Sequence, residues 1–250
     1  MERRIHLLLD LQYILGRIFI VATAPLCFLF VRLMRYRTRD LKRIRAKIRL
    51  IYEEHEGPWL VCPNHLTMID SLVISYGMAS LADHILHFKR IPWNLPERKN
   101  FQQNRFLALL CYLLKCLPVD RGGSREELQK LLVKCCLLLS RGEGLMIFPE
   151  GGRSRTGHVD REKCSYGVGR FIDECKHCRV MLVYLRGDRQ ETFGMMPRFG
   201  ERFTMTVEVF DPGGMDGGGL RAQREYARRI VERLAVMEEE YFAERGQRHR

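Results

Sequence analysis

The sequence lacks a spaced cysteine framework, although it contains nine cysteines in 250 residues. The cysteines lie at irregular positions, so their pattern does not predict the disulfide network of a small secreted domain. The one Cys-x-x-Cys pair, Cys175 and Cys178, has no second pair at zinc-ligand spacing. We therefore expect free thiols in a reducing, cytosol-facing location, and we expect no metal site.

Motifs of two other classes of protein are also absent. There is no nucleic-acid-reading motif with interleaved aromatic residues, so we expect no nucleic acid partner. His65 has no second histidine at helical ligand spacing, which argues against zinc hydrolysis. The chain does carry a formal net charge of +12, which predicts an anionic partner. Without a nucleic-acid motif, the remaining candidates are an acidic membrane leaflet and a phosphorylated substrate.

An uninterrupted apolar run long enough to span a membrane is missing as well. The segment Ile5 to Met34 is mostly apolar, but its clean run, Ile18 to Val31, covers about 21 Å as a helix against a hydrocarbon core of about 30 Å. A cleaved signal peptide does not fit, because the apolar run starts late and leads directly into basic sequence. Pro25 would kink the helix, so we expect a retained anchor, re-entrant or interfacial, in preference to a buried core helix.

Basic residues follow this apolar segment directly. Nine Lys or Arg and a single acidic residue, Asp40, lie between Arg32 and Arg49. Such a flank predicts binding to anionic membrane lipids and a position on the cytoplasmic face, although a charge run can also be a solvated helix face. We therefore divide the chain into residues 1–50, a membrane anchor with a basic juxtamembrane helix, and residues 51–250, a catalytic domain.

The pattern of the second part predicts an α/β fold with a mixed central sheet flanked by helices. The expected strands are Trp59–Cys62, Ile85–Phe88, Leu117–Val119, Leu145–Phe148, Val180–Leu185 and Phe203–Phe210. The expected helices are Thr67–Ala79, Arg105–Lys115, Ser124–Arg141 and Tyr166–Glu174, followed by an amphipathic tail that ends near Gly246. Ser124 and Glu127 form a capping-box pattern at the start of the third of these helices.

A histidine and a carboxylate lie five positions apart after the first expected strand of this domain. Within one regular helix the side chains of His65 and Asp70 would point about 140° apart, so a contact requires His65 to lie outside the helix. Thr67 is a reasonable N-cap, which leaves His65 in the loop and Asp70 in the first turn. Asp70 could then orient His65 as a general base, or it could simply complete a capping box with Thr67.

Two later turns carry arginines beside glycines. The segment Phe148–Gly157 leaves a strand with the glycine pair Gly151-Gly152 and two arginines, which suits a phosphate group. The segment Pro118–Gly123 repeats an arginine before glycines, and by itself it would be a plain surface turn.

Together, Asn64-His65 with Asp70, then Val119-Asp120-Arg121, then Phe148 to Ser154, resemble the motifs of the glycerol-phosphate acyltransferase superfamily, in its lysophospholipid (1-acylglycerol-3-phosphate) acyltransferase family. The resemblance covers roughly Trp59 to Leu185, and the combination is far more specific than any single motif. It includes the His-x4-Asp motif of the superfamily.

The resemblance implies that His65 is the general base and Asp70 its partner. It implies that Arg121, Glu150, Gly151 and Arg153 bind the phosphate or polar head of a lysolipid acceptor. The donor would be acyl-CoA or acyl-carrier protein as a co-substrate, and no cofactor is expected.

Two departures from the commonest family pattern leave the acceptor open. Gly152 stands where threonine is usual, and Val180–Leu185 lacks the proline usual in the fourth motif. The alternatives are therefore the same chemistry on another acceptor, such as a lyso-aminolipid, or a membrane scaffold without catalysis. The presence of both His65 and Asp70 argues against the scaffold.

Overall fold

The computed structural model describes residues 2–120, 122–175, 177–215 and 218–248, which form a mixed six-stranded sheet flanked by helices. The order of the strands in the sheet is β1-β6-β5-β2-β4-β3. Their bounds are β1 (Arg37–Thr38), β2 (Trp59–Pro63), β3 (Trp93–Asn94), β4 (Leu145–Met146), β5 (Arg179–Gly187) and β6 (Arg202–Phe210). Neighbouring strands run parallel except β5 and β6, which are antiparallel.

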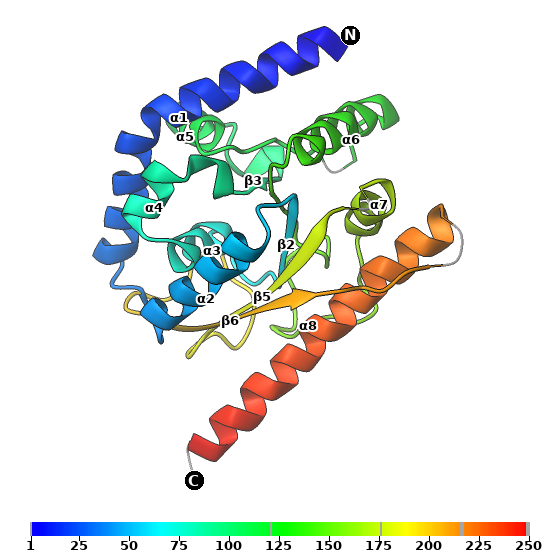
Figure 1. Ribbon diagram of the computed structural model, residues 1–250. Helices are drawn as coiled ribbons and strands as arrows, with labels where there is room; N and C mark the ends of the chain where they lie inside the picture. The colour runs from blue at the N-terminus through cyan, green and yellow to red at the C-terminus, as the bar shows by residue number, and fades with distance from the viewer. Residues whose placement is uncertain (1, 121, 176, 216–217, 249–250) are drawn as a thin grey trace.

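The helices connect these strands and cover both faces of the sheet (Figure 1). They are α1 (Glu2–Leu33), α2 (Leu41–Glu54), α3 (Asp70–Met78), α4 (Leu81–Leu86), α5 (Arg105–Leu113), α6 (Arg125–Ser140), α7 (Tyr166–Glu174) and α8 (Leu220–Arg248). Two short 3-10 helices, η1 (Phe88–Arg90) and η2 (Arg98–Asn100), lie on either side of β3.

The two central strands are buried on both faces, and their side chains alternate between two cores. In β2, Leu60 and Cys62 join the core beneath α6, α7 and α8, while Trp59 and Val61 join the core beneath α2 and α3. This alternation follows from the two-residue period of a strand. Burial on both faces explains the almost continuous apolar sequence of β2 and β5.

Most of the predicted elements are confirmed. The strands expected at Trp59–Cys62, Val180–Leu185 and Phe203–Phe210 are present as β2, β5 and β6. The Ser124–Glu127 capping box starts α6, and the amphipathic tail is α8, whose inner side buries Ala222, Tyr226, Ile230, Leu234 and Met237. The strand expected at Leu145–Phe148 is shorter, because β4 pairs with its neighbours through Leu145 and Met146.

Two predicted strands are wrong. Residues Ile85–Phe88 end α4 and begin η1, because Ser80 and Asp83 form a capping box that starts a helix (both N–H···O distances are 3.1 Å). Within this stretch Phe88 is buried and Leu86 is exposed. Leu117–Val119 is extended but is no strand of the sheet, since this stretch pairs through isolated bridges of Cys116 and Val119.

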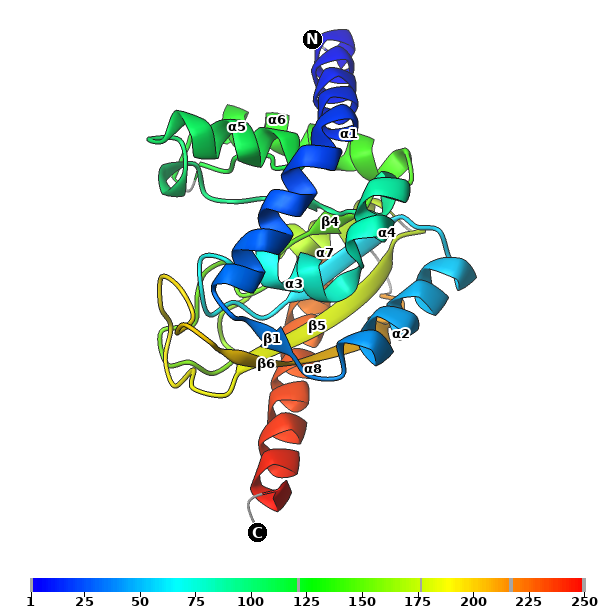
Figure 2. The ribbon, with the colours of Figure 1, turned by 90° about the vertical axis from the view of Figure 1, so that its left-hand side faces the viewer.

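The N-terminal helix α1 is continuous from Glu2 to Leu33, and it bends in its middle (Figures 1 and 2). Pro25 lies inside it and removes one backbone hydrogen bond, as the predicted kink requires. Among the described residues α1 is the one helix long and apolar enough to cross a membrane. One stripe, including Leu9, Ile20 and Ala24, packs against the domain, while the other side exposes apolar residues. Its length and composition suggest membrane association.

The basic segment after α1 belongs to the same packed body as the rest of the chain. β1 pairs with β6, and α2 buries Ile48, Ile51 and Tyr52 against the sheet. Arg45 donates to the Tyr76 carbonyl (2.6 Å) and Lys47 to the Val207 carbonyl (2.6 Å), so part of the basic charge is used within the fold. Packing therefore crosses the predicted division at residue 50.

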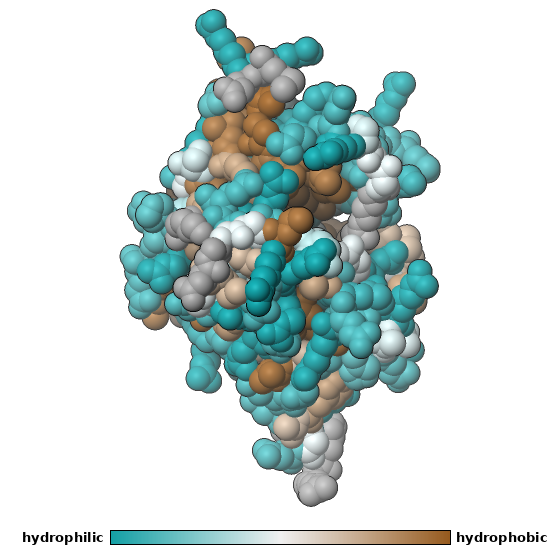
Figure 3. All heavy atoms as spheres, turned by 90° about the vertical axis from the view of Figure 1, so that its right-hand side faces the viewer, coloured by the Kyte–Doolittle hydropathy of each residue, from teal (hydrophilic) through white to brown (hydrophobic). Residues whose placement is uncertain are grey.

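The face of the molecule on the right of Figure 1 is largely hydrophilic (Figure 3). Hydrophobic side chains gather near the top of that view, where the N-terminal half of α1 lies. The exposed apolar residues of this half include Leu7, Leu8 and Leu11. On this face the exposed apolar side chains therefore gather along the N-terminal half of α1.

Candidate active site

The His65–Asp70 pair lies where β2 ends and α3 begins, at the carboxyl end of the central parallel strand. His65 Nδ1 is 3.1 Å from Asp70 Oδ2, with His65 in the loop and Asp70 in the first turn of α3. The Asp70 carboxylate is buried, and the His65 side chain is 15% exposed. The geometry expected from the five-residue spacing is therefore present, while the catalytic role of the pair remains a prediction.

Asp70 serves the loop as well as the imidazole. Its Oδ2 accepts the backbone N–H groups of Leu66 (2.6 Å) and Thr67 (2.7 Å), and its Oδ1 accepts the Thr67 hydroxyl. The helix begins at Asp70 with Ile69 as N-cap, so the prediction of Thr67 as N-cap is wrong by two residues. Thr67 instead joins the turn before the helix. The Asp70 carboxylate therefore contacts both the His65 imidazole and Thr67.

The imidazole is fixed from a second side by an aromatic ring. Phe148, just after β4, stacks on His65 with ring centroids 3.9 Å apart and an interplanar angle of 26°. Because Nδ1 faces Asp70, the Nε2 nitrogen is directed away from that carboxylate. An Nδ1–H tautomer would leave Nε2 able to accept a proton.

Glu150 lies behind His65 and holds its backbone. Glu150 Oε1 accepts the His65 N–H (3.1 Å), and Oε2 accepts the Asp160 N–H at 3.4 Å. The side chain is buried, and burial raises the pKa of Glu150 to about 7. The acceptor-binding role of Glu150 rests on the family resemblance, and in this structure its carboxylate supports the histidine loop.

Gly151 and Ser154 shape the turn that follows Glu150. Gly151 has a φ of +69°, which favours glycine, and a Cβ there would lie 3.3 Å from the Cβ of Ser165. The Ser154 N–H donates to the His65 carbonyl (2.9 Å), a contact that the sequence did not predict. The turn after β4 is thus tied to both sides of the His65 peptide.

Arg153 reaches the same side of the domain as His65. Its Nη1 donates to the Gly194 carbonyl (3.0 Å), and its guanidinium lies over the Phe193 ring at 5.6 Å. Arg121, the other predicted phosphate-binding arginine, lies outside the described residues. The arrangement therefore brings together His65, Asp70, Glu150 and Arg153, with Gly151 in the supporting turn.

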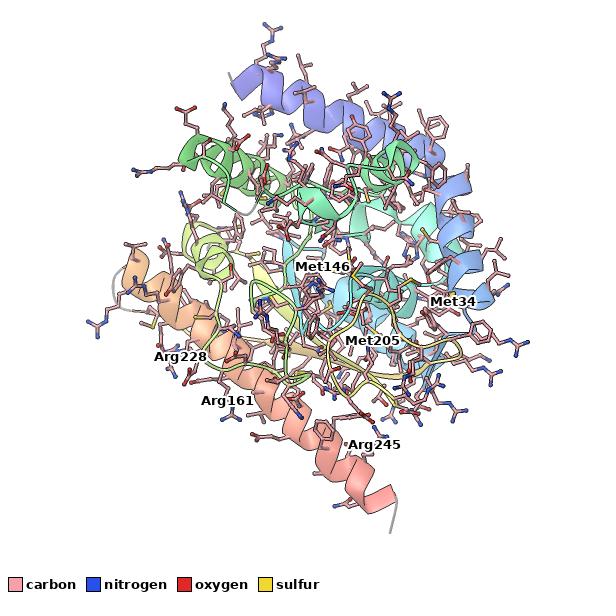
Figure 4. The ribbon with its side chains drawn as sticks, turned by 180° about the vertical axis from the view of Figure 1, so that it is seen from behind. Met34, Met146, Arg161, Met205, Arg228 and Arg245 are labelled. Carbon is pink, nitrogen blue, oxygen red and sulfur yellow. The ribbon has the colours of Figure 1, made fainter. Side chains whose placement is uncertain are left out.

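A largely apolar cavity of about 330 Å³ opens beside His65 and Arg153, which both line it. Its walls come from α1, α3 and α5 and from the segment between β3 and α5, and they include Ile20, Phe28, Leu72, Leu95, Phe101 and Leu110. Met146 of β4 also lines it and lies near the centre of the molecule in Figure 4. That α1 and α5 share a cavity wall could not be predicted from the sequence, because no local pattern reports contacts between segments so far apart in the chain.

The remaining candidate groups carry no metal-binding arrangement. No group of three or more His, Cys, Asp or Glu suited to a metal ion occurs within residues 2–120, 122–175, 177–215 and 218–248. The nine cysteines are free thiols, and Cys175 is the C-cap residue of α7.

The family model described as Acyltransferase matches residues 37–208, which is more than half of the chain and includes His65, Asp70, Glu150 and Arg153. No match to a curated protein was found. The matched range begins at β1 and ends in β6, so it includes residues of every strand of the sheet. A match over more than half of the chain identifies it as a member of the Acyltransferase family.

Proposed function

We propose that this protein transfers a fatty acyl group from acyl-CoA or acyl-carrier protein to the hydroxyl of a lysophospholipid such as 1-acylglycerol-3-phosphate. Membership of the Acyltransferase family supports an enzyme that transfers acyl groups. The observation that carries the finer proposal is the contact of His65 Nδ1 with Asp70 Oδ2 (3.1 Å) beside an apolar cavity that Arg153 also lines.

In the proposed reaction, His65 acts as general base and Asp70 as a positioning residue. Nε2 of His65 takes the proton of the acceptor hydroxyl while the hydroxyl oxygen attacks the carbonyl carbon of the thioester. The carbon–oxygen bond forms, the carbon–sulfur bond breaks, and the thiolate leaves with the proton returned by the imidazolium. A thioester is already activated, so no cysteine or serine nucleophile is needed. A general base contributes roughly 10²- to 10⁴-fold to such a step.

In this proposal the cavity binds the acyl chain and Arg153 binds the headgroup of the acceptor. An acyl chain fits the apolar walls, since burying each methylene contributes about 0.8 kcal/mol. The Arg153 guanidinium would pair with the phosphate of the acceptor, because its planar fork suits phosphate oxygens. The predicted role of Arg121 is the same.

The proposed location is the cytoplasmic face of a membrane. α1 supplies an apolar outer side, and Lys42 and Arg43 of α2 are exposed next to it in sequence, where anionic headgroups would attract them. A lysolipid acceptor would then reach the cavity from the bilayer in which it is dissolved.

The test is acyl transfer by the purified full chain. Labelled acyl-CoA, and separately acyl-carrier protein, is offered with a panel of lysolipids that differ in headgroup, including a lyso-aminolipid, and products are identified by mass spectrometry. We expect transfer to a phosphate-bearing acceptor and a loss of at least about 10²-fold in His65→Ala. Transfer to another headgroup would favour the alternative acceptor. Equal rates in wild type and His65→Ala would contradict the assignment of the base, and no transfer to any acceptor would favour the scaffold.

A further inference from the structure

The loop between β5 and β6 exposes four large apolar side chains near its tip. Phe193, Met195, Met196 and Phe199 are exposed by 44, 63, 45 and 57%. We call residues 193–199 the apolar rim. A cluster of exposed large apolar side chains on one short loop is unusual for a surface that faces water.

The apolar rim is joined to the histidine loop by backbone hydrogen bonds. Gly194 N–H donates to the Leu66 carbonyl (3.0 Å), and Met68 N–H donates to the Met195 carbonyl (3.1 Å). Arg153 adds a bond to the Gly194 carbonyl (3.0 Å). Displacement of the rim would therefore be transmitted to the residues on either side of Thr67 and to Arg153.

The other side of the rim is joined to the end of α1. Gly200 N–H donates to the Met34 carbonyl (2.8 Å), and the Tyr36 hydroxyl donates to the Pro197 carbonyl (2.9 Å). Met34 lies at this end of α1 in Figure 4. Leu29 and Leu33, in the last turns of α1, are exposed by 51 and 66%. The exposed apolar side of α1 thus leads to the rim.

A second exposed apolar element lies on the same side of the molecule. Figure 2 shows α5 and the loop after β5 projecting from the left of the view, above and below the end of the sheet. Phe106 and Leu109 of α5 are largely exposed, while Leu110 on the same helix lines the cavity. Apolar side chains therefore lie on two sides of the cavity region.

The charges around the rim suit an anionic surface. The Arg35 guanidinium lies over the Phe199 ring at 5.5 Å, and Arg198 is exposed. Asp188 is paired with Arg39 and Glu201 with Arg189, which leaves Glu191 as the exposed acidic residue nearest the tip. Apolar side chains beside arginines are the composition of a segment that lies at the level of lipid headgroups.

We propose that the apolar rim inserts into the headgroup region of an anionic phospholipid bilayer and holds the His65 loop and its cavity against the lipid. This inference rests on the proposed function, because it assumes an acceptor that is dissolved in the membrane. It assigns to the β5–β6 loop a role in positioning the site on the bilayer, in addition to the anchoring by α1.

Depth-dependent quenching tests the contact without any use of activity. The native tryptophans, Trp59 and Trp93, are buried, so a tryptophan added by Phe199→Trp can be followed separately by difference from wild type. Vesicles of phosphatidylcholine and phosphatidylglycerol with brominated chains are expected to quench the added emission, and a matched Leu220→Trp variant at the start of α8 is expected to keep its emission. Equal quenching of the two variants, or none of Phe199→Trp, would overturn the proposal.

A rate comparison tests the consequence. Met196→Ser/Phe199→Ser changes two rim residues and keeps Phe193 and Met195, which contact Arg153, and Leu220→Ser is the matched control. The double variant should still bind the membrane, because α1 anchors it. We expect its rate of acyl transfer to fall at least about tenfold when the acceptor is in vesicles. In detergent micelles we expect its rate to change by less than about twofold. An equal loss in vesicles and micelles would instead indicate damage to the site, and no loss in either would contradict the role of the rim. If wild type transfers no acyl group at all, the proposed function fails, and the quenching result alone decides the membrane contact.

Discussion

The carboxyl group of Glu150 gives the sharpest test of how the site is supported. Burial raises its pKa from 4.5 to about 7, against the opposing effect of the His65 and Asp160 N–H groups. Below pH 4.5 the group is neutral in both the folded and the unfolded protein. Between pH 4.5 and about 7 the unfolded state loses the proton and the folded state keeps it, so stability falls as pH rises through this window.

The size of the effect follows from the same shift. A difference of about 2.5 pKa units corresponds to about 3 kcal/mol at pH 8, where the buried group is ionised in both states. Glu150→Gln removes the titration, while its amide oxygen can still accept the His65 N–H. We therefore expect the variant to have about the stability of wild type at pH 4.5 to 5 and to become more stable than wild type as the pH rises to 8. For a chain of this size, about 3 kcal/mol corresponds to roughly 6 to 12 °C in Tm.

The assay is thermal unfolding of wild type and Glu150→Gln from pH 4.5 to 8.5 in one detergent, followed by tryptophan fluorescence. Glu56→Gln, at an exposed glutamate, is the control for loss of a surface charge. A difference in Tm between wild type and Glu150→Gln that is the same at every pH would refute the reasoning, because a fixed difference reports hydrogen bonding and packing without titration.

Three further substitutions have directions that follow from the structure. Asp70→Asn should lower kcat/KM for acyl transfer by at least about 10²-fold, because the amide has one acceptor oxygen where Oδ2 now accepts from the imidazole and the turn and Oδ1 accepts from the Thr67 hydroxyl. Lys115→Met should destabilise the fold by about 3–5 kcal/mol in denaturant unfolding, since it leaves the buried Glu143 carboxylate (2.7 Å away) unpaired, and adding Glu143→Gln should recover part of the loss. Gly169→Ala should lower Tm, because its Cβ would lie 1.8 Å from the Gln223 carbonyl oxygen and must push α8 from α7, at a cost of about 1–3 kcal/mol.

The elements that sequence predicted correctly are those whose signal is local. The β2 and β5 strands have continuous apolar runs, α6 has its capping box, and α8 has apolar residues at helical spacing. The strand predicted at Ile85–Phe88 is wrong because a short apolar run occurs in strands and in short helices alike, and the capping box of Ser80 and Asp83 starts a helix just before it.

The site was predictable in its centre and less so in its surroundings. The five-residue spacing of His65 and Asp70 could be analysed as helix geometry, and the side chains do meet. By contrast, Glu150 meets the His65 N–H across 85 positions, and the Phe148 ring covers the imidazole from a different strand. Such contacts depend on which strands become neighbours, and β2 and β4 are brought together by a parallel pairing that no local pattern specifies.

The way in which the histidine loop is held limits where the charge of a reaction intermediate can be stabilised. Three consecutive backbone N–H groups, those of His65, Leu66 and Thr67, donate to the carboxylates of Glu150 and Asp70. Amides that are already bound to carboxylates cannot also form an oxyanion hole without giving up these bonds. Attack on a thioester beside His65 would place negative charge on the carbonyl oxygen, which needs donors within about 3 Å. In the proposed reaction the oxyanion would therefore need donors other than these three amides.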